Sequence, residues 1–220
     1  MGLLHKIGIV VGVNNIASSI FEELFPDFLK VKYDQPSEYI KKYWGKYEIY
    51  AKKEKLEDNN VTNGKIFEYL LATLFIREDI LPFYLEAKVA FVPNVKFDLM
   101  LYAEECGPIC ISAKMSLRER YKQADLEAIA LKYVHRKSKI FLITLNEKEA
   151  EGIKKKIKTG DVIGLDDVIY AKSARFDELI KELKTNYKFS QAGKIQIIEA
   201  SQIVTRESLK GLVKALKSVD

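Results

Sequence analysis

An acidic and a basic residue stand in two neighbouring segments that both have the pattern of β-strands. Asp98 lies among apolar residues in segment 95–101, and Lys114 ends the next apolar segment, which begins at residue 109. A carboxylate in apolar surroundings is costly to bury without a partner, and a tight turn between the two strands would place Asp98 beside Lys114. A metal-binding carboxylate next to a cation suits metal-assisted phosphodiester hydrolysis. The alternative is a structural ion pair at a sheet edge.

The segments around this pair predict the order helix, three strands, helix, strand. Apolar spacing indicates a helix over 61–77, capped by Thr62 or Asn63. Strands at 83–91, 95–102 and 109–113 have short connections, which predicts an antiparallel meander. A helix follows from Ser116, and a buried strand occupies 139–145. We further expect helices at 16–25, 37–48, 147–158, 174–186 and 205–217, strands at 166–171 and 194–198, a strand or helix start at 7–13, and a loop at 52–60.

Composition excludes several classes of protein. With 220 residues, 48% hydrophobic and 30% charged, the chain can build a core and is not disordered. No apolar run reaches the roughly 18 residues that span a bilayer, and no signal peptide is apparent, which predicts a cytoplasmic protein without membrane contact. Cys106 and Cys110 are too few for a disulfide framework or a zinc site, and His5 and His135 stand apart. No organic cofactor is expected, and the net charge of +5 permits a polyanionic partner.

The chain resembles the PD-(D/E)XK nuclease superfamily over residues 62–145. The resemblance rests on the element order, on Gly64 and Glu68 in the first helix, and on Asp98 and Lys114. It implies an α/β fold with a restriction-endonuclease-like core, in which helices flank a central mixed sheet. The chain departs from the family pattern because Phe97 replaces a proline and Ser112 stands where the second carboxylate is usual.

One branch of type II restriction endonucleases carries that carboxylate on the following helix instead. Residues 114–128, KMSLRERYKQADLEA, resemble the motif of this branch, and the resemblance assigns Glu127 as the displaced carboxylate. Residues 120, 123 and 127 share one helix face, from which Glu127 could reach a metal near Asp98. The competing carboxylate, Asp125, points about 200° away around the helix.

The resemblance also implies a role for each site residue. Asp98 and Glu127 would bind Mg²⁺, and Glu68 would assist a metal ion, through water or at a second site. Lys114 would orient or help activate the attacking water and offset phosphate charge, with Ser112 as a neighbour of the metal ligands. The alternatives are that Glu68 and Glu127 are ordinary solvated helix residues.

In the same branch, a short charged segment reads C·G pairs in the major groove. Here it is Arg118-Glu119-Arg120. Arginine binds guanine through two hydrogen bonds and an acid accepts one from cytosine, so a site of CCGG or CC-spacer-GG type is implied. Lys122 and Gln123 are further expected DNA contacts. Ser116 and Glu119 also match a helix capping box, and Glu119 cannot fully serve both roles.

These features together predict a Mg²⁺-dependent, site-specific endonuclease of double-stranded DNA that leaves 5′-phosphate and 3′-hydroxyl ends. A palindromic site matches two-fold protein symmetry, which favours a homodimer or a higher oligomer. We expect a single domain, 1–220, with an N-terminal helical subregion at 1–60 that could dimerise or touch DNA, a catalytic core at 61–190 and a C-terminal strand–helix extension at 191–220. The alternatives are a structure-specific or repair nuclease of the same superfamily, and a catalytically decayed DNA-binding protein.

Overall fold

A mixed sheet is the centre of the computed structural model, which describes residues 2–12, 15–92, 94–191, 198–200 and 202–209. Its order is β5-β4-β3-β2-β1-β6, and β7 also pairs with β1. The β1–β2 and β2–β3 pairs are antiparallel, whereas β3–β4 and β4–β5 are parallel, so the predicted meander and mixed sheet are confirmed. The strands are β1 (Phe83–Val89), β2 (Phe97–Ala103), β3 (Gly107–Lys114), β4 (Lys139–Thr144), β5 (Asp167–Tyr170), β6 (Ile198–Glu199) and β7 (Gln202–Val204).

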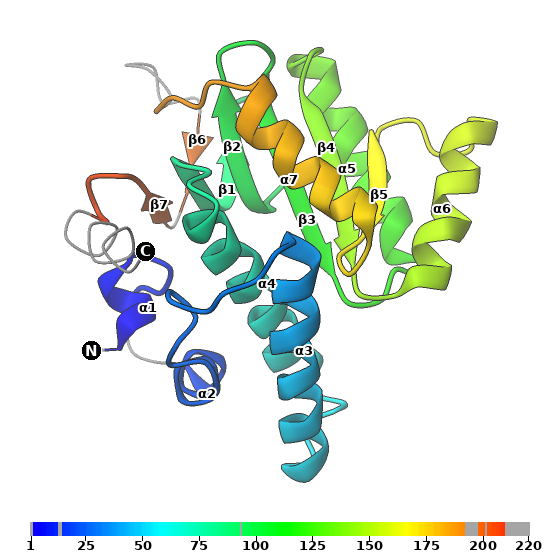
Figure 1. Cartoon of the computed structure of the whole chain (residues 1–220). Coiled ribbons are helices and arrows are strands. Elements are labelled where there is room, and N and C mark those ends of the chain that lie inside the picture. The colour runs from blue at the N-terminus through cyan, green and yellow to red at the C-terminus, as the bar shows by residue number, and fades with distance from the viewer. Residues whose placement is uncertain (1, 13–14, 93, 192–197, 201, 210–220) are drawn as a thin grey trace.

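Helices cover both faces of this sheet, as an α/β architecture requires (Figure 1). Helices α2, α3, α4 and α7 share one hydrophobic core with one face, and α5 and α6 pack on the other. Figure 1 shows α7 crossing in front of the strands. The helices are α1 (Leu3–Lys6), α2 (Ile16–Leu24), α3 (Pro36–Lys53), α4 (Asn60–Arg77), α5 (Arg120–Val134), α6 (Glu147–Thr159) and α7 (Ala174–Asn186).

Strand β3 lies in the middle of the sheet and is buried on both faces, which explains its continuous apolar run. Ile109, Ile111 and Ala113 belong to the core beneath α4 and α7, and Cys110 belongs to the core beneath α5. Because side chains alternate along a strand, Lys114 at the end of β3 lies on the α5 face of the sheet.

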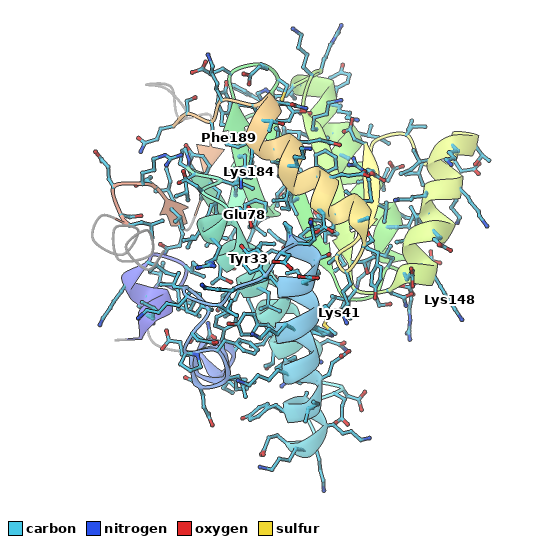
Figure 2. The ribbon with its side chains drawn as sticks, viewed as in Figure 1. Tyr33, Lys41, Glu78, Lys148, Lys184 and Phe189 are labelled. Atoms are coloured by element: carbon cyan, nitrogen blue, oxygen red, sulfur yellow. The ribbon has the colours of Figure 1, made fainter. Side chains whose placement is uncertain are left out.

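Glu78, directly after α4, links three segments on the α7 side of the molecule. Its Oε1 accepts a hydrogen bond of 2.6 Å from the Tyr33 hydroxyl, and its Oε2 pairs with Lys184 Nζ of α7 at 2.7 Å (Figure 2). This arrangement fixes the end of α4 against α7, and α4 carries one of the predicted site residues.

Several boundaries differ from the sequence-based expectation. Asn59, rather than Thr62 or Asn63, caps α4 through the Thr62 amide, and Asn63 is buried with its side chain bonded to Tyr47. Residues 7–12 belong to no strand or helix. The helix expected from Ser116 begins at Arg120.

The C-terminal predictions are only partly covered by the described residues. The expected strand at 194–198 has residues 194–197 outside them, and β6 begins at Ile198. The expected final helix is wrong at its start, because residues 205–209 form a turn in which Thr205 and Ser208 bond to one another; residues 210–217 lie outside the described part. In the part of the chain that the structure describes, no helix is both long and apolar enough to cross a membrane.

Hydrogen bonds to the Asp125 side chain connect α5 to the loop before β5. Its buried carboxylate accepts hydrogen bonds from the amides of Gly164 at 2.6 Å and Leu165 at 3.2 Å. A side chain at position 164 would meet the Asp125 carbonyl at 2.4 Å, so only glycine permits this approach. The contact joins α5 to the loop that leads into β5, which gives Asp125 a structural role.

We predict that Asp125→Ala lowers the free energy of unfolding by about 2–3 kcal/mol, because it leaves buried amides without a charged acceptor. Urea denaturation measures this loss. Asp34→Ala, which removes an exposed carboxylate, is the matched control and should change stability by less than about 0.5 kcal/mol. Equal effects of the two substitutions would contradict the stabilising role of the Asp125 hydrogen bonds.

Candidate active site

Asp98 and Lys114 meet at the open end of the β2–β3 pair. The register pairs Leu99 with Ile111, so Asp98 faces Ser112 across the ladder and Lys114 lies diagonally on the same face. Asp98 Oδ2 accepts hydrogen bonds from Lys114 Nζ at 2.8 Å and from the Ala113 amide at 2.7 Å. The carboxylate side chain is 18% exposed and the lysine side chain 31% exposed, so the pair is largely shielded yet reachable.

Ser112 is buried beside this pair, opposite Asp98 in the sheet. A hydroxyl carries no formal charge, so it does not supply the negative charge with which a second carboxylate would attract a hard cation. The β2–β3 pair therefore contributes one carboxylate, that of Asp98, and a second carboxylate must come from another element.

Glu68 approaches from α4. Its Oε2 pairs with Lys65 Nζ at 2.7 Å, one turn earlier on the same helix. Burial raises the pKa of Glu68, and the negative charge of Asp98 raises it further, while Lys65 and Lys114 act in the opposite direction. The charges of both Asp98 and Lys114 therefore influence the pKa of Glu68.

Glu127 approaches from α5 on the other face. It is half-buried, and its Oε1 accepts a hydrogen bond of 2.8 Å from Gln123, one turn away. Burial raises the pKa of Glu127; Lys114 lowers it and Asp98 raises it to a smaller extent. The structure thus brings Glu127 into the same electrostatic environment as the strand pair.

Three further charged residues, Lys65, Glu86 and Lys96, surround the site, and the sequence patterns did not single them out. Lys65 Nζ bonds Glu86 Oε1 at 2.7 Å as well as Glu68, and Lys96 Nζ bonds Glu86 Oε2 at 2.7 Å. These bonds hold the pKa of Glu86 down at about 2. Burial alone would lower the pKa of Lys65, but its two carboxylate partners raise it above the usual value.

Glu86 stands in β1 in register with Asp98, because Leu85 pairs with Leu99 and Ala87 with Phe97. Its φ angle is +50°, a left-handed conformation that is strained for any residue with a side chain. Such strain often accompanies functional sites. An acidic residue in the middle of a largely buried strand is the sequence signal that could have indicated it.

Two hollows meet at these residues. A cleft of about 580 Å³ runs between α4 and the end of β3, and a smaller one of about 190 Å³ lies on the β1 side. Lys65 and Glu68 line both of them; Lys114, Arg118 and Arg120 line the larger, and Glu86 and Asp98 the smaller. The site is therefore open to solvent on both sides of Lys65 and Glu68 and is not an enclosed pocket.

The predicted DNA-reading segment borders the larger cleft. Arg118, Glu119 and Arg120 are exposed, and Glu119 pairs with Lys122 at 2.5 Å. Lys122 is also exposed, whereas Gln123 directs its amide to Glu127. Arg118 and Arg120 are thus available to a ligand in the cleft, whereas Glu119 and Lys122 pair with one another and Gln123 bonds to Glu127.

The capping box predicted for this helix is wrong. Glu119 is itself the N-cap residue of α5, and its side chain makes no capping hydrogen bond. The Ser116 hydroxyl instead donates to Glu149 Oε1 at 3.2 Å, and Arg118 has a φ of +29°, which no helix allows. The helix therefore begins four residues after Ser116, and Glu119 is released from the competing role.

The acidic residues suit a hard divalent cation, because carboxylate oxygens are the ligands that Mg²⁺ prefers. Within the described ranges, no group of three or more His, Cys, Asp or Glu residues is gathered closely enough to hold a metal ion. The ammonium groups of Lys65 and Lys114 are the cations that lie against Glu68 and Asp98. The carboxylates thus already hold positive charge at this position, which fits a site that attracts a cation.

One comparison with known proteins found a match. The family model described as BsaWI restriction endonuclease type 2 matches residues 89–194, a little under half of the chain. The matched stretch contains Asp98, Lys114 and Glu127 and begins after Glu68. Comparisons with curated proteins and with solved structures gave no match. The family match indicates a type II site-specific deoxyribonuclease, whose substrate is DNA, and the α/β fold is consistent with a restriction-endonuclease-like core.

We predict that Glu68→Gln raises the melting temperature at neutral pH. The folded-state pKa of Glu68 lies above the ordinary value of 4.5. Ionisation of Glu68 therefore destabilises the folded state as the pH rises from 4.5 through the folded-state pKa. The amide avoids this cost and can still accept a bond from Lys65. Thermal unfolding from pH 3 to 8 checks the prediction.

The gain in stability should vanish below the ordinary glutamate pKa, where both side chains are neutral. Glu151→Gln, at an exposed position on α6, is the control and should not change the melting temperature. A pH-independent gain, or a loss at neutral pH, would contradict the desolvation argument.

Proposed function

We propose that the chain is a Mg²⁺-dependent restriction endonuclease that cuts both strands of a palindromic, C·G-containing site and leaves 5′-phosphate and 3′-hydroxyl ends. The observation that carries the proposal is the pairing of Asp98 with Lys114, with Glu127 in the same electrostatic environment from the opposite helix. Its support from outside the chain is the match to a type II restriction endonuclease family over the stretch that holds all three residues.

Asp98 and Glu127 are the proposed ligands of the metal ion, with Glu68 assisting from α4. When bound, a divalent ion supplies positive charge that stabilises the negative charge developing on the phosphate. The half-buried position of Glu127 and the shielding of Asp98 strengthen their attraction for a cation, because charges interact more strongly away from bulk water.

Lys114 is the proposed residue for orienting the attacking water and for neutralising phosphate charge. Its ammonium group donates to Asp98 in the structure and lines the larger cleft, where a phosphate of the backbone would lie. Lysine serves this purpose because its compact charge carries three donors that can be shared between a carboxylate, a water molecule and a phosphate.

Arg118, Glu119 and Arg120 are the proposed readers of the base sequence, and Lys122 is a proposed phosphate contact. The exposure of all four side chains and the position of Arg118 and Arg120 along the cleft support this assignment, as does the absence of a capping hydrogen bond from the Glu119 side chain. Two arginines and one glutamate match the acceptors of guanine and the donor of cytosine in the major groove.

Cutting both strands of a palindrome is simplest for two copies of the chain related by a two-fold axis, so we propose a homodimer. The division into an N-terminal helical subregion at 1–60, a catalytic core at 61–190 and an extension at 191–220 belongs to the same proposal. Residues 9–11 line the smaller hollow beside Asp98, which supports a role of the N-terminal subregion next to the core.

We predict that the purified protein cuts a sequenced phage genome into discrete bands, and that this requires Mg²⁺. Glu127→Gln should reduce cutting by at least about a hundredfold, because it removes the charge of a metal ligand while keeping its size. Sequencing of the fragment ends should reveal one palindromic site that contains C·G pairs.

Glu151→Gln on the exposed side of α6 is the matched control and should cut like the wild type. A smear in place of bands would point to a structure-specific or nonspecific nuclease. Unchanged cutting by Glu127→Gln would exclude the displaced-carboxylate site, and no cutting by the wild type would leave a DNA-binding protein.

A further inference from the structure

The segment between β3 and α5 joins the candidate catalytic lysine to the proposed DNA readers. Lys114 ends the strand, and Arg120 begins the helix, so only residues 115–119 lie between them. Arg118 and Arg120 line the same cleft as Lys114. The position of the readers relative to the reacting phosphate therefore depends on how this short segment is held.

The end of β4 and the first turn of α6 hold three consecutive residues of the segment. The Thr144 hydroxyl donates to the Met115 carbonyl at 3.3 Å. The Glu149 carboxylate, in the first turn of α6, accepts from the Ser116 hydroxyl at 3.2 Å through Oε1 and from the Leu117 amide at 2.5 Å through Oε2. Both oxygens of Glu149 are thus engaged with a segment more than thirty residues away in the sequence.

Glu149 is itself fixed in place. Asn146 caps α6 by accepting from the Glu149 amide at 3.1 Å, and a carboxylate in the first turn is stabilised by the helix dipole. The side chain is only partly exposed. A charged acceptor held on a rigid element makes a stronger and better-defined hydrogen bond than a neutral one on a loop.

The contacts with Thr144 and Glu149 end at Leu117, directly before the proposed DNA-reading segment. The Leu117 side chain is fully buried, and its carbonyl accepts from the Arg120 amide at 2.5 Å, which starts the first turn of α5. Arg118 then takes a left-handed φ of +29°. This conformation is unfavourable on its own, so contacts on either side of Arg118 must maintain it.

We propose that Glu149 is a positioning residue for DNA recognition, which fixes the register of Arg118-Glu119-Arg120 relative to Lys114. The proposal rests on the proposed function of that segment. Base discrimination by two-point hydrogen bonds depends on exact placement, whereas Lys114 is held by its bond to Asp98 and by the pairing of β3 with β4, which do not involve Glu149. Loss of the Glu149 contacts therefore relaxes the choice of sequence more than it slows hydrolysis.

Four variants separate this role from a general effect on stability. Glu149→Ala removes both contacts, and Ser116→Ala removes one of them. In Glu149→Gln, the amide oxygen can accept from Leu117 while the amide nitrogen donates to the Ser116 hydroxyl. This variant tests whether a neutral side chain of the same size, with both hydrogen bonds, restores sequence discrimination. Glu151→Ala changes an exposed residue of the same helix and is the control.

The experiment compares cleavage of a duplex carrying the site mapped by end sequencing with duplexes in which one base pair of that site is changed. The readout is the ratio of kcat/KM for the intact and the best altered site. We predict that Glu149→Ala lowers this ratio about tenfold or more, with KM for the intact site rising more than kcat falls. Ser116→Ala should lower the ratio to a smaller extent, Glu149→Gln should restore most of it, and Glu151→Ala should not change it.

An equal loss of activity on all duplexes, with the ratio unchanged, would overturn the proposal, as would a glutamine variant no better than alanine. If Glu149→Ala does not fold, as judged by circular dichroism, the ratio for Ser116→Ala decides, and an unchanged ratio counts against the proposal. Arg118→Ala and Arg120→Ala distinguish a failure of the positioning role of Glu149 from a failure of the proposed base reading by residues 118–120. If they lower the ratio while Glu149→Ala does not, only the positioning role is wrong; if neither lowers it, the reading segment itself is wrong.

Discussion

The hydrogen bonds to one carboxylate oxygen of Asp98 determine the arrangement of the site. The oxygen accepts from the backbone of β3 through Ala113 and from the end of β3 through Lys114, at 2.7 and 2.8 Å. These bonds tie two central strands together at the point where helices from both faces converge. An acid at this depth needs such partners, and the sheet register, the end of β3 and the approach of α4 and α5 all accommodate it.

The charges of the site stabilise one another only incompletely. Glu68 and Glu127 both have a raised pKa, chiefly from burial, despite the nearby ammonium groups of Lys65 and Lys114. The folded chain therefore holds two carboxylates in a state that disfavours their ionisation. A bound divalent cation relieves the same cost, which links the stability of the free protein to its attraction for metal. Sites selected for function commonly sacrifice stability in this way.

The sequence predicted the elements and the strand pair well, because both depend on local pattern. Apolar periodicity set the core helices and strands, and the short turn between β2 and β3 forced Asp98 toward Lys114. The bonds of Lys65 with Glu86 and of Glu149 with Ser116 could not be predicted, since they join segments 21 and 33 residues apart through side chains alone. The start of α5 was predicted too early for the same reason. The Ser116 hydroxyl, which a capping box with Glu119 would have used, is bonded to the distant Glu149 instead.

The most direct test of the central claim is to locate the metal ion. Manganese prefers the same oxygen ligands as magnesium and scatters anomalously, so crystals of the protein with a cognate duplex and Mn²⁺ would show its position. We predict an anomalous peak within about 2.0–2.6 Å of carboxylate oxygens of both Asp98 and Glu127. A peak bound by Asp98 without Glu127, or one away from both residues, would contradict it.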